Sequence, residues 1–505
     1  MDFWIWCSLI IPILVYTVTK VFSQLCYFSK WGIPHPLELP IVGVMHMLFL
    51  PRRHVNDLIK CIYNTNRQAK YVGAHVFLSS TIFVRDLDLI KSILIKNFDH
   101  FADRKTFVDE KVDPLFGLNL NFLNGDRWRE IRNILSPSFT SSKMRSMYAL
   151  MSDCAKKFSD AFIKIHKDED DIDIKDAFSK YTNDVIASCA FGIEVDSVNN
   201  PNNEFYLRAK EVAVFKGSTN LKLLLELLFP DLTRKFGMRI VSKRLTDFFI
   251  NVIDTTIKAR EEKGIVRPDM LQLLMEARST MSKERAAKFN LTEMTAQAFL
   301  FFLAGFEASA TQSSLMAFEM ALNPDVQSRV QIEIDEVMLA TKGRPTYDAI
   351  GNMTYLDAVF SETLRKHPIA FLNRLCSKEF ELPPAIPGAK PYKMTPGMGI
   401  MIPVAGIHAD PDLYDNPDKF EPERFIGKKS TSTDVSNLGF GMGPRMCIGN
   451  RFAILEIKAL FVYLLAKCTL VPCGKTCIPF VYQKNLFAAM PENGFWLKIE
   501  PRNKA

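Results

Sequence analysis

The sequence lacks a compact cysteine framework. Its ten cysteines are scattered over 505 residues, and only Cys473 and Cys477 stand close together. Small disulfide-stabilised domains and zinc modules need closely spaced cysteines or histidines. The scatter therefore excludes a disulfide scaffold and leaves Cys473 and Cys477 as a weak alternative metal site. It is typical of a protein from a reducing compartment.

Strong charge and internal repeats are also missing. The net charge of +7 is mild for a chain of this length, and it does not indicate nucleic-acid binding. An acidic protein partner or an anionic membrane surface fits this charge equally well. With 48% hydrophobic residues, the chain can bury a large core as one domain or as two fused lobes.

One uncharged run stands at the N-terminus. The stretch "FWIWCSLIIPILVYTVT", from Phe3 to Thr19, has 17 residues, the short end of what spans about 30 Å of hydrocarbon. Only Asp2 precedes it, whereas Lys20 and Lys30 follow it, a distribution that keeps the body of the protein in the cytosol. We predict a retained anchor over residues 1–24 rather than a cleaved signal peptide. A proline-rich linker over 25–43 and the main domain over 44–505 follow.

Apolar residues beyond Gly43 recur mostly at helical spacing. Long helical stretches are expected near 128–165, 240–277, 292–322 and 450–467. Strand-like pieces are short, near 74–86, near 397–408 and in the C-terminal "GFWLKIEP". The pattern predicts a mainly α fold with a small β lobe, of the α+β class.

A glycine-rich loop holds an isolated cysteine. In "FGMGPRMCIGNRFA", residues 440–453, Cys447 follows Arg445 and precedes a helical run. A nearby cation and a helix N-terminus favour a thiolate, so Cys447 is a structural cysteine, a nucleophile or a metal ligand. No local motif supplies a histidine base or further zinc ligands. A haem iron, by contrast, needs one protein thiolate.

This loop resembles the cysteine loop of the cytochrome P450 monooxygenases. The resemblance implies that Cys447 is the proximal ligand of a haem b iron and that Arg445 pairs with a haem propionate. Phe440 and Gly449 occupy the other signature positions of the loop. In the family, amides of this loop hydrogen-bond to the sulfur.

Further motifs carry the same resemblance over nearly the whole chain. In "SETLRKHP", Glu362 and Arg365 can pair on one helical face, and "FEPERF" supplies Arg424, which joins that pair in the family's structural network. "DRWREIRNILSPSFTSSKM" contains Trp128 and Arg132, and "FLNRLCSKEF" contains Arg374, at positions that meet haem propionates. These motifs imply the cytochrome P450 fold.

Three stretches narrow the resemblance to the microsomal insect branch called family 9, which is linked to detoxification. They are "RKTFVDEKVDPLF", "SPSFTSSKM" and "FFLAGFEASA". Such enzymes lie on the endoplasmic-reticulum membrane, take electrons from NADPH through a diflavin reductase, and also accept cytochrome b5 as a partner. Basic residues that could receive the acidic reductase, or could be plain solvated charges, are Arg127, Arg129, Lys143, Lys428, Lys429 and Arg451.

The family mapping also predicts an apolar substrate pocket. A helix over 292–322 would run about 45 Å, long enough to cross the distal haem face. The predicted walls, each of which could equally be core, are Phe116, Leu118, Phe122, Phe301, Phe302, Ala304, Gly305, Ile369, Phe371, Leu486 and Phe487. The segment 221–232 either dips into the bilayer or packs as a core helix.

The distal motif departs from the family. "AGFEASA" keeps Glu307 but places Ala308 where the family has a threonine, whose hydroxyl helps to deliver protons during oxygen activation. Ser309 is the nearest hydroxyl, about 100° further around the helix. Three functions therefore stay open: a monooxygenase of lipophilic compounds, a haem-thiolate isomerase or dehydratase acting on peroxides, and a haem protein that sequesters hydrophobic ligands.

Overall fold

The computed structural model describes residues 23–24, 26–49, 53–106, 108–213, 222, 225–226, 229–369, 371–427, 438–484 and 489–502. Nearly all of the expected anchor and part of the segment 221–232 lie outside these ranges, as do Lys428, Lys429, Leu486 and Phe487. Within the described ranges, no helix combines the length and hydropathy that a membrane crossing requires.

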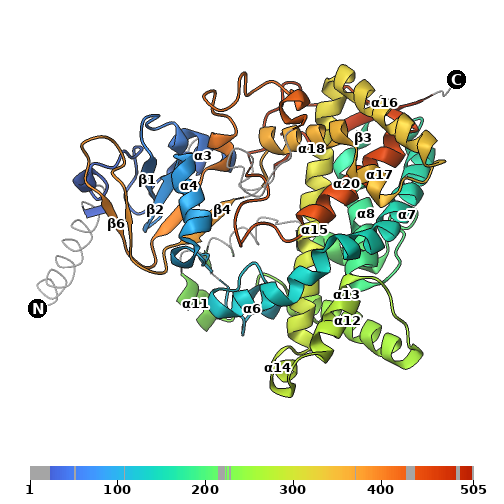
Figure 1. Ribbon diagram of the computed structural model, residues 1–505, viewed down its shortest axis with the longest axis horizontal. Coiled ribbons are helices and arrows are strands. Elements are labelled where there is room, and N and C mark those ends of the chain that lie inside the picture. The colour runs from blue at the N-terminus through green and yellow to red at the C-terminus, as the bar shows by residue number, and fades with distance from the viewer. Residues whose placement is uncertain are drawn as a thin grey trace, which may run out of the picture.

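A β lobe forms the end of the molecule nearest the N-terminus (Figure 1). Its sheet has the order β1-β2-β7-β4, with β1 (Tyr71–Val76), β2 (Ser79–Val84), β7 (Gly399–Ile402) and β4 (Leu372–Leu375). β2 pairs in parallel with β7, and the other two pairings are antiparallel. Since β1 and β2 come from the first hundred residues and β4 and β7 from far later, the lobe joins distant parts of the chain.

Smaller sheets complete the strand content of the described chain. One has the order β3-β9-β8, with β3 (Ile172–Asp173), β9 (Trp496–Pro501) and β8 (Cys468–Pro472), and another pairs β5 (Phe380–Leu382) with β6 (Tyr392–Met394). The antiparallel pairing of β3 with β9 joins the C-terminal strand to the residues directly before helix α8 (Ile174–Ile186). The strand-like C-terminal stretch is therefore a strand.

Helices make up the larger lobe (Figure 1). They are α5 (Pro114–Gly117), α6 (Gly125–Leu135), α7 (Ser141–His166), α8 (Ile174–Ile186), α9 (Glu204–Ala213), α11 (Pro230–Lys235), α12 (Lys243–Lys263), α13 (Met270–Ser279), α14 (Lys283–Lys288), α15 (Leu291–Leu322), α16 (Pro324–Ala340), α17 (Tyr347–Gly351), α18 (Thr354–Lys366) and α20 (Asn450–Leu465). Four short helices flank the β lobe: α2 (His46–Phe49), α3 (Val55–Tyr63), α4 (Leu87–Lys91) and α19 (Val404–Ile407). The prediction of a mainly helical α+β fold is confirmed.

Helix α15 is the central element of the helical lobe. It begins after Asn290, whose side chain accepts a hydrogen bond from the Glu293 amide, an arrangement that satisfies an otherwise unpaired helix N–H. It ends at Leu322, just before Pro324 opens α16. Apolar residues surround it on most sides, as expected for a helix inside a large protein. In Figure 1 it runs the full height of the lobe.

A buried ion network fixes α18 against the segment that follows the β lobe. Glu362 and Arg365 are 0% and 1% exposed, and Arg365 Nε and Nη2 donate to the two carboxylate oxygens of Glu362 at 2.7 and 2.8 Å. Arg424 Nε lies 3.5 Å from Glu362 Oε1. Arg365 Nη1 donates to the His408 carbonyl at 2.8 Å. The three side chains that the family motifs single out therefore meet in one cluster.

Replacing Glu362 tests the network. Glu362→Gln removes the negative charge but keeps the shape, so it leaves Arg365 buried with an uncompensated charge. We expect the free energy of unfolding to fall by about 3–5 kcal/mol, measured by urea denaturation with far-UV circular dichroism. Asp348→Asn is the control, because Asp348 pairs with Arg145 where both side chains are more than half exposed, and such pairs contribute little. Equal effects of the two variants would contradict a structural role for the buried pair.

Candidate active site

A cavity of about 380 Å³ lies between α15 and the loop that precedes α20. Helix α15 lines it with Leu300, Phe301, Ala304, Gly305, Ala308, Ser309 and Gln312. These positions recur at helical intervals, so they form one face of the helix. The opposite wall contains Gly439, Phe440, Arg445, Met446, Cys447, Ile448 and Gly449. The predicted cysteine loop and the predicted distal helix thus face the same space.

The backbone of the cysteine loop is folded back on itself. The Cys447 amide donates to the Phe440 carbonyl at 2.9 Å, and the Met446 amide donates to the Gly443 carbonyl at 2.9 Å. Gly443 has φ +73°, and a Cβ there would lie 2.1 Å from the Leu94 carbonyl oxygen. Only glycine allows that approach without strain. The loop therefore places Cys447 at the cavity, just before α20 begins at Asn450.

The thiol of Cys447 is accessible, and its accessible surface faces the cavity. Burial raises the pKa of Cys447, although a backbone hydrogen bond from Gly449 and the charges of Arg132 and Arg104 act to lower it. The loop therefore has features that favour the thiolate and a burial that opposes it. Loss of water around the sulfur outweighs the nearby cations, so a bound metal ion would be needed to stabilise the thiolate.

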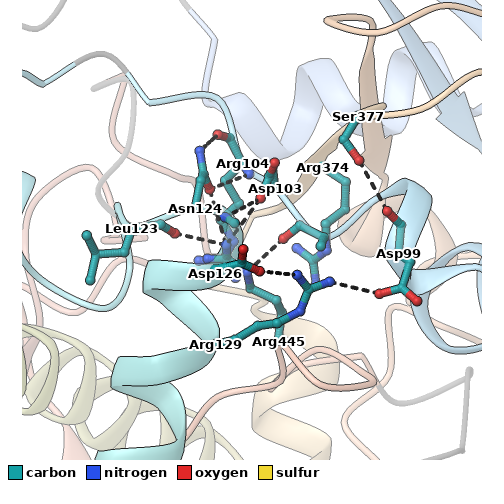
Figure 2. A network of polar contacts seen from close by, with 12 residues as sticks. Asp99, Asp103, Arg104, Leu123, Asn124, Asp126, Arg129, Arg374, Ser377 and Arg445 are labelled. Carbon is teal, nitrogen blue, oxygen red and sulfur yellow. Dashed lines mark hydrogen bonds and ion pairs between the residues drawn. The ribbon is translucent and has the colours of Figure 1, made fainter.

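Arginine side chains gather beside the cavity: Arg104 and Arg445 line it, and Arg374 lies next to them (Figure 2). Arg445 is 5% exposed and Arg374, on β4, is 2% exposed. Arg445 donates to the Ala102 carbonyl at 2.8 Å and to the Leu123 carbonyl at 2.9 Å. Figure 2 shows that Arg104 comes close to both from a third segment. Burial, together with the charge of Arg104, lowers the pKa of Arg445 to about 9.

Several donors of this arginine cluster have no partner in the described chain. They are Arg104 Nε, Arg374 Nε, Arg374 Nη2 and Arg445 Nη1, all buried. Burial, together with the charges of Arg104 and Arg445, lowers the pKa of Arg374. Asp103 Oδ1 lies 4.0 Å from Arg445, too far for a hydrogen bond. Unpaired buried cations are costly, so the cluster fits an anionic ligand with two carboxylates.

Trp128 and Arg132 of α6 belong to the same wall. The guanidinium carbon of Arg445 lies 4.1 Å from the centre of the Trp128 ring, a cation–π contact that holds the arginine in place. Arg132 is partly buried and lines the cavity. Together with the thiol opposite, these residues fit haem, whose iron takes a thiolate and whose propionates take the arginines.

Of the three predicted catalytic residues, two line the cavity and one does not. Ala308 and Ser309 both line the cavity, so the step around the helix does not turn Ser309 away from it. Glu307 is not among the lining residues; its Oε1 lies 3.0 Å from Lys175 Nζ and accepts from Thr311 Oγ1 at 3.3 Å. Glu307 therefore points to a polar group on the side of α15 next to α8.

Only some of the residues predicted to form the pocket walls border the cavity. Phe301, Ala304, Gly305, Ile369 and Phe371 line the cavity. Phe302 is instead 0% exposed and packs against Phe191 and Phe249. Phe116, Leu118 and Phe122 do not border this cavity, and Phe116 packs against Phe299. A pocket role for these four residues stays a prediction.

Several lining residues were missed by sequence reasoning. Arg104 opens the stretch "RKTFVDEKVDPLF" but was given no role of its own, and Leu120, Asn121 and Gln312 were not considered. Arg104 lies outside the helical and cysteine-loop motifs, in a segment without regular structure. The signal that could have identified it was an arginine without an assigned role, upstream of the helix that contains Trp128 and Arg132.

Comparison with known proteins decides the family. The cytochrome P450 family model matches residues 34–499. The chain belongs to the cytochrome P450 family. Similar proteins include cytochrome P450 9e2 of Blattella germanica, 39% identical with 94% of each chain covered. Probable cytochrome P450 9f2 of Drosophila melanogaster is 36% identical, with 94% of this chain and 95% of the relative covered. The resemblance to the insect family 9 branch is confirmed, and the family implies a haem monooxygenase.

Substitution of Cys447 tests the ligand assignment in this cytochrome P450. Cys447→Ser should abolish the red-shifted absorption band that thiolate ligation gives to the reduced carbon monoxide complex, because serine supplies no thiolate. Haem content is measured in the same sample. Cys61→Ser, at an exposed cysteine on α3, should leave the band unchanged. Persistence of the band in Cys447→Ser would overturn the assignment.

Gly443 gives a test of the loop backbone. Gly443→Ala should lower haem occupancy and reduce stability by about 1–3 kcal/mol, because its φ is left-handed and its Cβ would overlap Leu94. Gly474→Ala is the control, since a Cβ there meets nothing within 4 Å. Haem titration and thermal unfolding measure both effects. Equal behaviour of the two variants would show that the loop relaxes freely.

Proposed function

We propose that this protein is a microsomal monooxygenase that inserts one oxygen atom from O2 into lipophilic small molecules, with electrons from NADPH delivered by a diflavin reductase. The observation that carries the proposal is the cavity with a thiol on one wall and unpaired buried guanidinium groups beside it. Cys447 would hold the iron of haem b, and Arg104, Arg374 and Arg445 would hold the propionates. When bound, haem supplies oxygen binding and activation.

Apolar side chains support a lipophilic substrate. Leu300, Phe301, Ile369 and Phe371 line the cavity beside Ala304 and Ala308. Aromatic and aliphatic walls with few polar groups are typical of sites for apolar ligands. The small side chains of α15 leave room near the centre, and the bulky ones exclude water from the rest. Plant toxins, insecticides and endogenous lipids are the proposed substrate class.

Proton delivery is the step that Ala308 changes. Without a hydroxyl at that position, the nearest α15 hydroxyl at the cavity is that of Ser309, 3% exposed. This departure from the family keeps two further functions in view: an isomerase or dehydratase acting on peroxides, and a hydrophobic-ligand-binding haem protein. Neither needs protons to be delivered during oxygen activation.

Fewer basic residues remain as candidate contacts for the reductase than the sequence suggests. Arg127 pairs with Glu110 and Glu293, and Arg129 pairs with Asp99 and Asp126. These partners already neutralise both arginines. Among the predicted contacts in the described chain, Lys143 and Arg451 are exposed. They lie near the starts of α7 and α20. We propose them as contacts for the acidic reductase, with cytochrome b5 as a second donor.

We also propose that residues 1–24 anchor the protein in the endoplasmic-reticulum membrane with the catalytic domain in the cytosol. The support is the uncharged run from Phe3 to Thr19 and the positive charge after it. Relatives from insect family 9 match along 94% of the chain.

A reconstitution experiment tests the function. Full-length protein, reductase and NADPH are incubated with a panel of lipophilic compounds, and products are identified by mass. A product heavier by one oxygen atom, dependent on both reductase and NADPH, is the expected result. Turnover of a fatty-acid hydroperoxide without reductase would instead favour the isomerase, and ligand-binding spectra without turnover would favour the sequestering protein.

Ala308→Thr tests the missing hydroxyl. Proton delivery during oxygen activation competes with release of hydrogen peroxide, and a positioned proton donor favours delivery. We therefore expect the ratio of product to hydrogen peroxide to rise severalfold, with substrate affinity changed less. NADPH consumption, peroxide and product are measured in one reaction. Ala340→Thr, at an exposed position of α16, is the control.

Two other outcomes would contradict this expectation. A fall in both substrate binding and turnover would show that the cavity has no room for threonine. An unchanged ratio with intact binding would show that another proton path already operates.

A further inference from the structure

A chain of three polar side chains joins α15, the end of α18 and the C-terminal loop. His367, directly after α18, is 3% exposed, and Glu319 of α15 is 1% exposed. His367 Nε2 lies 2.6 Å from Glu319 Oε1, and its Nδ1 lies 3.2 Å from the Tyr482 hydroxyl. We call Glu319, His367 and Tyr482 the clamp. None of the three borders the cavity, so haem binding does not explain them.

The protonation states fix the direction of both hydrogen bonds. Burial acts to raise the pKa of Glu319, but hydrogen bonds from His367 and from Lys366, 3.0 Å away, lower it overall. The Glu319 carboxylate therefore accepts, and His367 Nε2–H donates. Burial lowers the pKa of His367 and raises that of Tyr482. The imidazole is thus neutral, and its Nδ1 accepts from the Tyr482 hydroxyl.

The clamp ends where one wall of the cavity begins. Three residues of the segment between α18 and β4 line the cavity, namely Ile369, Phe371 and Leu372. His367 and Pro368 directly precede them, and the Pro368 carbonyl accepts from Asn56 Nδ2 at 3.0 Å. Side chains from α3, α15 and the C-terminal loop therefore hold the first two residues of this segment.

Tyr482 is itself held in place on two sides. Its ring stacks on His54, the residue before α3, with ring centroids 4.4 Å apart and planes 9° apart. Two backbone hydrogen bonds of 2.8 Å join residues 481–483 to residues 490–492. The hydroxyl that His367 accepts from thus belongs to a paired and stacked residue, which makes it a fixed anchor.

We propose that the clamp sets the position of this cavity wall and thereby selects ligands by their size and shape, favouring a bulky lipophilic compound that fills the space beside Ile369 and Phe371. His367 is a positioning residue, because it acts through the segment that follows it. Loss of either hydrogen bond gives that segment more freedom, which a ligand in contact with the wall must remove on binding. The proposal rests on the proposed function in that haem occupies the cavity.

Two azoles of different size test the clamp without turnover. Imidazole and clotrimazole both shift the absorption bands of a haem protein by coordinating its iron, but only clotrimazole carries aryl groups large enough to reach the walls. Tyr482→Phe keeps the ring and removes the hydroxyl. It should weaken clotrimazole binding by about fivefold, the effect of one lost hydrogen bond, and leave imidazole binding unchanged. Tyr355→Phe is the control, since it removes a hydroxyl that donates to Glu423 at 3.2 Å, away from the cavity.

A double variant tests whether the hydroxyl acts through the histidine. His367→Gln places an amide N–H near the position of Nε2, so it can still donate to Glu319, but it has no acceptor at the position of Nδ1. It should weaken clotrimazole binding as Tyr482→Phe does. Adding Tyr482→Phe to His367→Gln should cost nothing further, because the hydroxyl has already lost its acceptor. Additive losses would overturn the clamp, since a general loss of packing gives them.

Hydrogen exchange tests the clamp without azole binding. In the full-length protein, backbone amides of the peptide that covers residues 367–375 should exchange severalfold faster in Tyr482→Phe than in wild type or Tyr355→Phe. Unchanged exchange would overturn the clamp, whether or not the protein is a monooxygenase. Faster exchange with an unchanged ratio of clotrimazole to imidazole affinity would overturn the role in ligand selection. Absence of an azole spectrum in wild type would contradict the proposed function, while the exchange result would still decide the clamp.

Discussion

The arginine cluster beside the cavity is the constraint on which the site depends. Arg104, Arg374 and Arg445 come from three separate segments and lie close enough for each to disfavour the charge of another. Protein carbonyls and the Trp128 ring satisfy part of Arg445, but the remaining donors have no protein partner in the described chain. Such an arrangement is stable only with an anionic ligand in place. An anionic ligand that binds these groups would therefore stabilise the folded state.

The balance between thiol and thiolate at Cys447 also depends on the cofactor. Burial disfavours the thiolate of Cys447, and iron would reverse that balance by coordination. The cofactor thus neutralises two unfavourable features at once, the unpaired guanidinium groups and the protonated thiol. The pair of Glu362 with Arg365 is the contrasting case, because there the buried charges are paired within the protein.

Helix α15 links oxygen chemistry to the protein core. Its cavity face combines small residues with Ser309, while Glu307 turns to Lys175. The absence of a threonine hydroxyl at Ala308 therefore leaves Ser309 as the α15 hydroxyl that lines the cavity.

The sequence by itself determined the family, the mainly helical fold, the long central helix and the cysteine loop, because these depend on local spacing and on motifs of adjacent residues. It also identified Glu362, Arg365 and Arg424, whose roles follow from such motifs. Only the tertiary structure decided that Arg104 joins the arginine cluster, that Phe302 is core and that Glu307 turns away from the cavity. Those facts depend on which elements pack together across hundreds of residues and on how much water is excluded between them. Helical spacing tells which residues share a face, but not what that face meets.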